Sequence, residues 1–385
     1  MNIIYFTTAQ EEKEYRSFMN LWKISLNSSN QNFHNKLIRA LAVNNHVDVI
    51  SVRPFSHSKT NVSKLKAETK QEGNICWHYL KRAGNKFVRL LDVVPQSKKI
   101  LSSLDTKNSI IITDTINTAL VRSVNKINKK YNLPVIGVCT DSPSNISGTK
   151  RSYTMYLLNN TQNFDGYIAL TEGLNQLFNP NKKPAYIFEG LVEDRKFEKA
   201  KEDKRPYLFF GGALMKRYGV FDLIEAFKLL KNKDIDLYIC GHHGNKEEIK
   251  EAIKGYSNIK FLGLLTMNKV LEYEANSLAC INPRPFSEDL DRFSIPSKTL
   301  EYLSSGSPVI SVKNTILMDK FKDEIIWVDS ARKEDLLKGI QKVLSMSEKE
   351  RESFGKEAKN RVLKLYSLDI IGENISQYLS QFVKQ

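Results

Sequence analysis

The sequence predicts an α/β protein built from two doubly wound parallel sheets. Short apolar runs alternate with helical patterns along the whole chain, as in parallel sheets that are covered by helices on both faces. At 385 residues the chain is too long for one ordinary hydrophobic core. The alternation stops at Glu189–Phe197 and the charged Lys199–Pro206 and then starts again, so we place the link between two domains there.

Five buried parallel strands are expected in the first domain, residues 1–188. Helical patterns lie between them, for example at Phe33–Leu41 and Ala119–Ile127. The expected strands are Ile3–Phe6, Val47–Ile50, Ile110–Ile112, Val135–Val138 and Tyr167–Leu170.

The second domain, residues 189–366, repeats the alternation with six strands, and the tail from Ser367 is expected to be helical. The strands are expected at Tyr207–Phe210, Leu237–Ile239, Ile259–Leu262, Leu278–Ile281, Val309–Val312 and Ile325–Val328. One helix is marked by an apolar stripe at a spacing of 3.6 residues. The stripe is formed by Val220, Leu223, Ile224, Phe227 and Leu230.

Composition indicates a globular protein of a reducing compartment. The 41% hydrophobic and 10% aromatic content argues against disorder. No apolar run approaches the roughly 20 residues of a membrane span, and Met1–Thr7 is typical of a strand rather than a signal peptide. No Cys-x-x-Cys or Cys/His spacing suggests zinc, so no metal is expected. The four cysteines are scattered, at Cys76, Cys139, Cys240 and Cys280.

The net charge of +15 is unevenly distributed. The first 200 residues hold 28 Lys and Arg against 16 Asp and Glu, and the excess is greatest between Lys59 and Lys107. Such a face favours nucleic acid, an anionic membrane surface or a lipid diphosphate. The mixed aromatic, aliphatic and basic segment Trp77–Leu91 suits a helix at a membrane interface or an ordinary amphipathic helix.

The most informative segment is Phe293–Ile310. Pro296 predicts the start of a helix, because its fixed φ suits a first turn, and Gly306 predicts its end. Lys298 and Glu301 lie three residues apart and share a face. The helix start would bind an anion and Glu301 would accept from hydroxyl groups, and a ribose diphosphate offers both.

This segment resembles the retaining glycosyltransferases of family four, which have the two-domain GT-B fold. The form Pro-Ser-Lys-x-x-Glu-Tyr-Leu-x-x-Gly-x-Pro-Val-Ile is similar to that of bacterial enzymes that build capsule and exopolysaccharide repeat units. The resemblance implies two Rossmann-like domains facing a central cleft. The acceptor lies on the first, the nucleotide sugar on the second, and the last helix, residues 367–385, crosses back to the first.

In that family a Glu-x7-Glu motif contacts the donor sugar with its first Glu and the ribose with its second. Glu301 matches the second, but Phe293 stands in place of the first. Glu288, Asp289 and Asp291 lie just upstream, and any of them could supply the missing carboxylate or belong to a solvated loop. We assign Asp289 to the donor.

A glycine-rich turn follows the first strand of the second domain. Gly211 and Gly212 would let the backbone approach a phosphate, with Lys216 and Arg217 as its cations. The family's loop carries its cations at the positions of Ala213 and Tyr218, so the pair is shifted here. The alternative is a β–α turn with two solvated cations.

Three further places in the second domain are candidates for the donor. Arg284 lies between two prolines after a buried strand and would reach the diphosphate, unless it is a surface arginine. Gly241-His-His-Gly244 follows an earlier strand. We interpret its two histidines as exposed and its two glycines as residues that shape the backbone of the nucleotide pocket. Gly263-Leu264-Leu265 resembles the segment whose backbone reads the base edge, so Leu264 is assigned to the donor, with Gly212, Ser297, Lys298 and Glu301.

Residues that follow strands of the first domain are candidates for the acceptor side. Thr8 follows the first strand, although the family usually has a glycine-rich loop there. Asn32 or His34 would face the cleft, or the Asn would cap a helix. The family often has a His-Asp pair after a strand at this place, and Asp141 matches its Asp; the alternative is that Asp141 caps a turn. The family also has a Ser-Glu pair after a later strand, and Glu172 matches only the Glu of that pair.

These observations predict a metal-independent, retaining transfer of a sugar from a nucleotide sugar to a glycan or a lipid-diphosphate acceptor of the polyprenyl type, in cell-surface polysaccharide synthesis. Lys216, Arg217 and Asp141 are the expected catalytic residues, and the donor is a substrate, with no cofactor. The expected location is the cytoplasm or the inner face of the cell membrane, as a monomer or an oligomer. The aromatics form no stacking motif, so nucleic acid is not expected. The alternatives are a GT-B nucleotide-sugar epimerase and a non-catalytic partner subunit.

Overall fold

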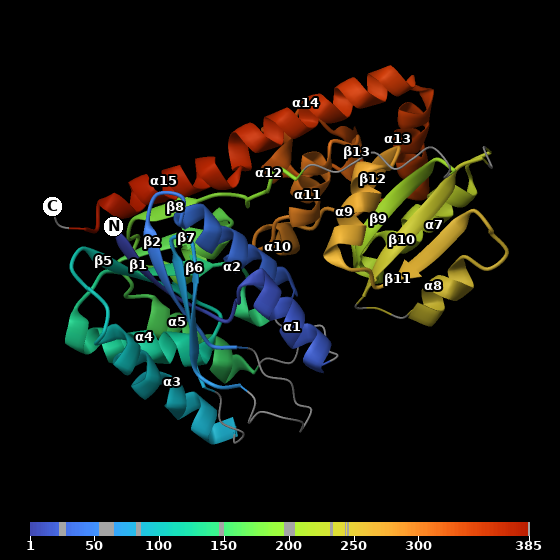
Figure 1. Ribbon diagram of the computed structural model, residues 1–385. Helices are drawn as coiled ribbons and strands as arrows, with labels where there is room; N and C mark the ends of the chain where they lie inside the picture. Colours follow the sequence, from blue (N-terminus) through green and yellow to red (C-terminus); the bar gives the residue numbers. More distant parts are fainter. Residues whose placement is uncertain are drawn as a thin grey trace. The chain divides into compact units, whose positions relative to one another are not determined.

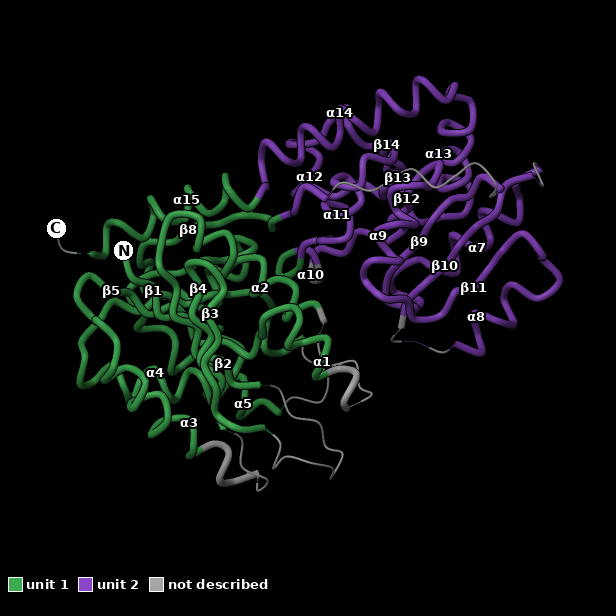
Figure 2. The backbone as a smooth tube through the Cα atoms, in the orientation of Figure 1, with its two compact units in different colours: residues 1–191, 292–294, 368–385 green, residues 192–291, 295–367 purple. Residues whose placement is uncertain are grey.

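The computed structural model divides the chain into two compact units (Figure 2). The first comprises residues 1–191, 292–294 and 368–385, and the second comprises 192–291 and 295–367. Each unit is a parallel sheet with covering helices (Figure 1), as the sequence predicted. The structure describes residues 1–22, 28–53, 65–81, 86–145, 150–195, 205–231, 234–242, 244 and 246–383.

The first unit has an eight-stranded sheet in the order β3-β4-β2-β1-β5-β6-β7-β8. All neighbours pair parallel except β3 and β4, which are antiparallel. Every strand predicted for this half is present within one or two residues. The strands are β1 (Asn2–Thr7), β2 (His46–Ser51), β3 (Glu68–Glu72), β4 (Ile75–Tyr79), β5 (Ser109–Asp114), β6 (Val135–Cys139), β7 (Gly166–Ala169) and β8 (Ala185–Ile187).

Helices cover both faces of this sheet (Figure 1). α4 packs between α3 and α5, and α15 packs against α2. The helices of the unit are α1 (Glu12–Trp22), α2 (Ser28–Leu41), α3 (Lys86–Leu101), α4 (Thr118–Tyr131), α5 (Arg151–Thr161), α6 (Glu172–Phe178) and α15 (Leu368–Ser380), with the 3-10 turn η2 (Pro143–Asn145).

The prediction of a helix through Trp77–Leu91 is wrong for its first part. Trp77 and Tyr79 lie in β4, where they are fully buried and stack at 6.1 Å between ring centroids. Burial alternates along β4 with a period of two, which is the strand period. Trp77 and Tyr79 therefore pack into the core and are not available to a membrane surface. Residues 82–85 lie outside the described residues.

The C-terminal helix α15 belongs to the first unit, although the chain reaches it through the second. Tyr378 anchors it, because its hydroxyl accepts from the Tyr167 N–H at 3.0 Å and donates to the Pro184 carbonyl at 2.9 Å. Gly372 permits close packing, since a Cβ there would lie 2.1 Å from the Ala40 carbonyl oxygen. Among the described helices, none combines the length and the apolar character that a bilayer span requires.

The second unit has a six-stranded parallel sheet in the order β11-β10-β9-β12-β13-β14. The predicted stripe lies on α7 (Val220–Lys228) and in the turn that follows, and all five residues are buried in the core. The strands are β9 (Tyr207–Ala213), β10 (Asp236–His242), β11 (Ile259–Gly263), β12 (Ala279–Asn282), β13 (Val309–Val312) and β14 (Ile326–Val328). The other helices are α8 (Lys246–Ala252), α9 (Met267–Ala275), α10 (Glu288–Asp291), α11 (Ser297–Ser305), α12 (Thr315–Met318), α13 (Lys333–Ser345) and α14 (Glu348–Tyr366), with the 3-10 turn η3 (Lys216–Tyr218).

Candidate functional site

The predicted donor residues of the second unit follow the carboxyl ends of its parallel strands. Because parallel strands end at one edge of a sheet, the loops after β9, β11 and β12 lie at the same edge. Gly212 and Lys216 follow β9, Leu264 follows β11, and Arg284 follows β12. The crossover from β12 to β13 contains α11, whose N-terminus faces this edge.

Helix α11 has the ends that the sequence predicted. Pro296 is its N-cap residue, and Gly306 ends it in the left-handed conformation at φ 85°. Ser297 is exposed. The first turn is less open than expected, because the Ser297 N–H donates to the Ile295 carbonyl and the Thr299 N–H to the Pro296 carbonyl, each at 2.8 Å.

Lys298 and Glu301 form an ion pair on α11. Lys298 Nζ lies 2.6 Å from Glu301 Oε2, and the side chains keep 37% and 19% of their surface exposed. Burial lowers the pKa of Lys298, but the carboxylates of Glu301 and the fully buried Glu274 raise it by more, so the pKa lies above its ordinary value. The lysine is therefore held as a cation beside a carboxylate that solvent can reach.

Tyr302 fastens α11 to the end of β9. Its hydroxyl accepts from the Gly211 N–H at 2.9 Å and donates to the Gly211 carbonyl at 3.0 Å. Burial raises the pKa of Tyr302, so the phenol stays protonated and able to donate. Tyr302 was not among the predicted site residues. The sequence feature that could have indicated this role is a tyrosine directly after Glu301, at a position of the helix that faces the core.

The loop after β9 presents its cations to solvent. Lys216 and Arg217 are exposed in η3, where Lys216 lies 3.7 Å from Glu248 Oε2 and Arg217 stacks over the Tyr218 ring. Gly219 ends this turn at φ 77°, and a Cβ there would lie 2.1 Å from the Pro283 carbonyl oxygen. The loop after β12 therefore packs directly against the cationic turn.

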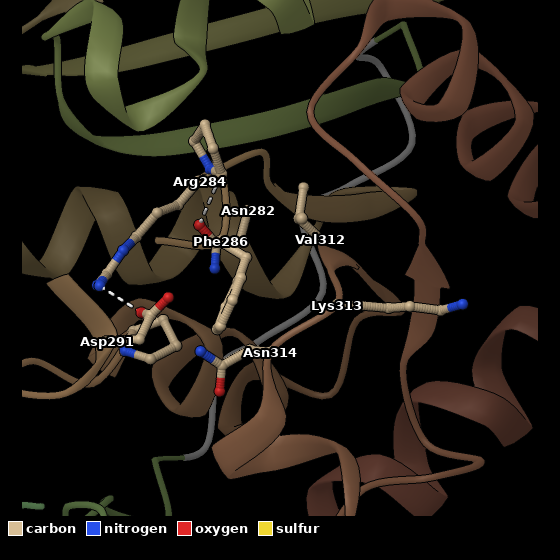
Figure 3. A pocket seen from close by; sticks show the side chains of 9 residues that line it. Asn282, Arg284, Phe286, Asp291, Val312, Lys313 and Asn314 are labelled. Atoms are coloured by element: carbon tan, nitrogen blue, oxygen red, sulfur yellow. Dashed lines mark hydrogen bonds and ion pairs between the residues drawn. The ribbon is translucent and has the colours of Figure 1, made fainter. Parts of the chain in front are cut away.

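A small pocket of about 190 Å³, which includes open solvent, lies beside the loop after β12 (Figure 3). Arg284 points toward Asp291, and their nearest atoms lie 2.6 Å apart. Asp291 also accepts from the Ser287 N–H at 3.0 Å. The volume is below the roughly 300 Å³ of a ligand pocket, so this hollow would hold part of a ligand. The lining residues are Asn282, Arg284, Pro285, Phe286, Asp291, Pro296, Val312, Lys313 and Asn314.

Two of the three acids that precede α11, Asp291 and Glu288, lie in different environments. Asp291 holds Arg284, while Glu288 is exposed, and the side chain of Asp289 lies outside the described residues. Phe293, which stands where the resemblance places a Glu, belongs to the first unit and packs against its core. Next to it, the Thr171 hydroxyl donates to the Arg292 carbonyl at 2.7 Å. Phe293 is thus used for packing.

The first glycine after β10 was predicted to shape the backbone rather than to bind a metal, and its geometry agrees. Gly241 has φ 151°, and a Cβ there would lie 1.7 Å from the Gly212 carbonyl oxygen. Only glycine therefore lets the ends of β9 and β10 approach so closely. Leu264, after β11, is 58% exposed. The side chains of His242 and His243 lie outside the described residues.

The corresponding edge of the first unit carries a buried polar network. His34 has no exposed surface; its Nδ1 lies 2.7 Å from the Tyr5 hydroxyl and its Nε2 lies 3.6 Å from Asp114 Oδ2. Burial lowers the pKa of His34, and the Asp114 carboxylate acts against this effect. Thr8 contacts Asn30 at 3.2 Å, and Asn30 donates to Asp114 at 3.3 Å.

This network revises the expected roles in the first domain. His34 lies inside α2 and is shielded from solvent, so it would act on a ligand only through its neighbours. The helix begins at Ser28, which makes Asn32 an interior residue and not a cap. Asp114, Tyr5 and Asn30 were not predicted, although Asp114 ends a strand at the edge where sites are found.

Asp141 and Glu172 also follow strands of this sheet. Asp141 follows β6, is half-buried, and accepts from the Ser142 N–H at 2.8 Å. Burial raises the pKa of Asp141 above its usual range. Glu172 is the exposed first residue of α6 and accepts from Asn175 at 3.4 Å. The parallel sheet therefore places Thr8, Asp114, Asp141 and Glu172 on one edge.

Comparison with known proteins finds a family match in the second half of the chain. Residues 192–361 match the model of the family described as Glycosyl transferases group 1. No curated protein matches the chain.

Solved structures resemble the chain over its whole length. They include sucrose-phosphate synthase from Thermosynechococcus elongatus (TM-score 0.67, 14% identity, 99% of each chain covered). An E. coli structure described as trehalose-6-phosphate bound with UDP-2-fluoro glucose has a TM-score of 0.66 at 12% identity, with 100% of each chain covered. The α,α-trehalose-phosphate synthase (UDP-forming) of Burkholderia vietnamiensis has a TM-score of 0.67 at 11% identity, with 99% of this chain and 98% of that chain covered. The expected GT-B fold and the expected enzyme class, glycosyltransferase, are confirmed.

Proposed function

We propose that this glycosyltransferase of the GT-B fold moves a sugar from a nucleoside-diphosphate sugar to a hydroxyl group, with retention of the anomeric configuration and without a metal at the reacting centre. The observation that carries the proposal is the Lys298–Glu301 pair, which Tyr302 fixes against the glycine turn after β9. A carboxylate and several cations at one sheet edge match a ribose and a diphosphate.

In this proposal the donor diphosphate contacts Lys216, Arg217 and the start of α11 at Ser297. Both cations are exposed, and the ion pair of Lys216 with Glu248 is long, so binding a phosphate costs little. Glu301 accepts hydrogen bonds from the ribose hydroxyls while it keeps Lys298 in place. Arg284 does not contact the diphosphate in this proposal, because Asp291 already holds its guanidinium. Instead it keeps the loop after β12 in position.

The transfer breaks the bond between the anomeric carbon and the phosphate oxygen and forms a bond from that carbon to the acceptor oxygen. The acceptor proton passes to the departing phosphate, whose negative charge grows as the bond breaks. Fixed cations at that oxygen lower the barrier, because they stabilise the transition state more than the ground state. Lys216 and Arg217 have this role, and no side chain is assigned as a base.

The acceptor we propose is a glycan or polyprenyl-linked saccharide of cell-surface polysaccharide synthesis. The Pro-Ser-Lys form of α11 and the positive charge of the first 200 residues support it. Sugar phosphates form a second acceptor class for testing, since two of the similar structures are named sucrose-phosphate and trehalose-phosphate synthases. Asp141, Thr8 and Glu172 are the residues proposed to face the acceptor.

The test combines binding and turnover. A panel of nucleotide sugars is expected to raise the melting temperature for the correct donor, and free nucleotide should be released when the acceptor is added. Glu301→Ala should weaken nucleotide binding by about 1–3 kcal/mol, as expected for lost bonds to buried hydroxyls. Glu357→Ala, on the exposed side of α14, is the control. Unchanged nucleotide affinity in a folded Glu301 variant, measured by calorimetry, would contradict the donor assignment.

Phe293 gives a specific reason to test a second function. Because packing replaces the first motif carboxylate, the chain could instead serve as a non-catalytic partner of an active transferase. Nucleotide binding without release of nucleotide, across all acceptors, would support that role. An isomerised nucleotide sugar formed without any acceptor would instead indicate an epimerase.

A further inference from the structure

Four side chains of metal-binding types lie on one face of the first unit's sheet. In the register of β2 and β4, Asp48 lies beside Cys76 and Ile50 lies beside His78. Since side chains two residues apart share a face of a strand, His46 and Asp48 of β2 lie on the same face as Cys76 and His78 of β4. The sequence shows only His-x-Asp and Cys-x-His, separated by 27 residues.

The distances are those of a compact cluster. His78 Nε2 lies 2.7 Å from Asp48 Oδ1, and His46 Nε2 lies 3.3 Å from Asp48 Oδ2. The ligand atoms of Asp48, Cys76 and His78 all lie within 4.8 Å of one another, whereas His46 lies outside this group of three and contacts Asp48. Asp48 and His78 are largely buried, at 9% and 11% side-chain exposure, and His46 lies beside Asp48 on the solvent side at 46% exposure.

We propose that His46, Asp48, Cys76 and His78 bind a zinc ion. Zinc prefers four ligands in a tetrahedron, with bonds of about 2.0–2.1 Å to nitrogen and oxygen and about 2.3 Å to sulfur. Tetrahedral bonds of that length place ligand atoms about 3.3–3.6 Å apart. The His46–Asp48 pair already has that spacing, and the His78–Asp48 pair must open by about 0.6 Å. His46 must also turn toward Cys76 and His78 to complete the tetrahedron.

The chemistry of the set favours zinc over harder ions. Thiolate and imidazole ligands suit zinc, whereas magnesium and calcium take oxygen ligands. Thr69 Oγ1 of β3 lies 3.4 Å from His78 Nδ1, so the second ring nitrogen already has an orienting neighbour. The alternative is a carboxylate that is shared by two histidines next to an unrelated thiol.

The position gives the ion a structural role, separate from sugar transfer. His46 begins β2, while the candidate acceptor residues follow the opposite, carboxyl ends of the strands. The ion would join β2 to β4 and thereby fix the exposed edge strand β3, which pairs with β4. A metal-independent reaction and a zinc-bound sheet are therefore compatible.

Metal titration tests the stoichiometry and the ligands. After treatment with a chelator, the full-length protein is expected to bind one equivalent of Zn²⁺ in calorimetry. With Co²⁺ it should show the thiolate charge-transfer and visible bands of a tetrahedral site. His46→Ala, which removes an exposed ligand, should weaken zinc binding by more than the roughly 10–100-fold cost of a lost outer-shell partner. Equal binding by wild type and by Cys76→Ser would overturn the proposal.

Alkylation of Cys76 provides a second test that does not require a variant to fold. Cys139, Cys240 and Cys280 are buried, so Cys76 is the accessible thiol of the chain. Zn²⁺ should slow its reaction with iodoacetamide at least tenfold, as followed by mass spectrometry, whereas Mg²⁺ should not. Gln71→Ala, whose residue pairs with Cys76 across β3 and β4, should keep the protection, and His46→Ala should lose it. A rate that Zn²⁺ leaves unchanged in the wild-type protein would refute the site.

Discussion

Both units are built on a sheet of mainly parallel strands, but a group of polar side chains at the carboxyl edge is at least partly exposed in one unit and buried in the other. At the carboxyl edge of the second unit, Lys216 and Arg217 are exposed, and the charged pair Lys298 and Glu301 is partly exposed. At that edge of the first unit, Tyr5, His34 and Asp114 are buried. The Tyr5 hydroxyl bonds to His34 Nδ1, and Asp114 Oδ2 lies 3.6 Å from His34 Nε2.

This difference suggests that the edge of the second unit serves ligand binding and that the edge of the first unit serves stability. Exposed ion pairs contribute little to folding, so the second unit can exchange them for a ligand at small cost. A buried polar network contributes strongly once every member has a partner, and it fixes the positions of its neighbours. Changes at the first edge should therefore act on stability, and changes at the second should act on donor affinity.

The largest expected effect follows from His34→Ala. The substitution leaves the buried Tyr5 hydroxyl without its partner and removes the imidazole beside Asp114, whose carboxylate still accepts from Asn30 and from the Ile116 N–H. With the cavity that the ring leaves, the loss should be about 3 kcal/mol of unfolding free energy. Nucleotide affinity should stay within about twofold, because the donor residues lie in the other unit. Urea denaturation and calorimetry measure the two quantities, and a large loss of affinity in a folded variant would break the comparison.

Tyr302→Phe should affect both quantities. Removal of the hydroxyl leaves the Gly211 N–H and carbonyl without their partner, at a cost of about 2 kcal/mol in stability. Donor affinity should fall as well, since the glycine turn loses its link to α11. Tyr256→Phe, at a residue that is 37% exposed, is the control and should change neither.

The pH dependence of stability should report on His34. Its pKa is lowered by burial, so the unfolded chain, with a histidine pKa of about 6.5, binds more protons than the folded protein in acid. The contribution is therefore complete above about pH 6.5 and is lost as the pH falls through the folded-state pKa. His34→Gln should show a smaller decline between pH 7 and 5 in chemical denaturation, and parallel curves would contradict the assignment.

Lys216→Ala is expected to have the smallest effect on folding. Its ion pair with Glu248 is long and exposed, so stability should change by less than about 0.5 kcal/mol. Donor affinity should nevertheless fall, and the salt dependence of binding should weaken, because one phosphate contact is lost. Lys250→Ala, an exposed lysine of α8, provides the matched control.

The sequence by itself determined the form of α11 and the order of the strands and helices apart from β3, β4 and β8. Pro296, Gly306 and the pair Lys298–Glu301 could be placed because a helix end and an i, i+3 contact depend on a few neighbouring residues. The stripe on α7 followed from the same short-range periodicity. The strand Trp77–Tyr79 was missed because its composition was weighed above its period of two.

Only the tertiary structure decided which polar residues meet. The burial of His34, the packing of Phe293, the bond from Tyr302 to Gly211 and the cluster around Asp48 each join residues from different elements. Sheet register and helix packing bring these residues together, and both depend on how the whole apolar surface of a unit is buried. No local pattern carries that information, so a residue's exposure and partners could not be predicted from its neighbours in the chain.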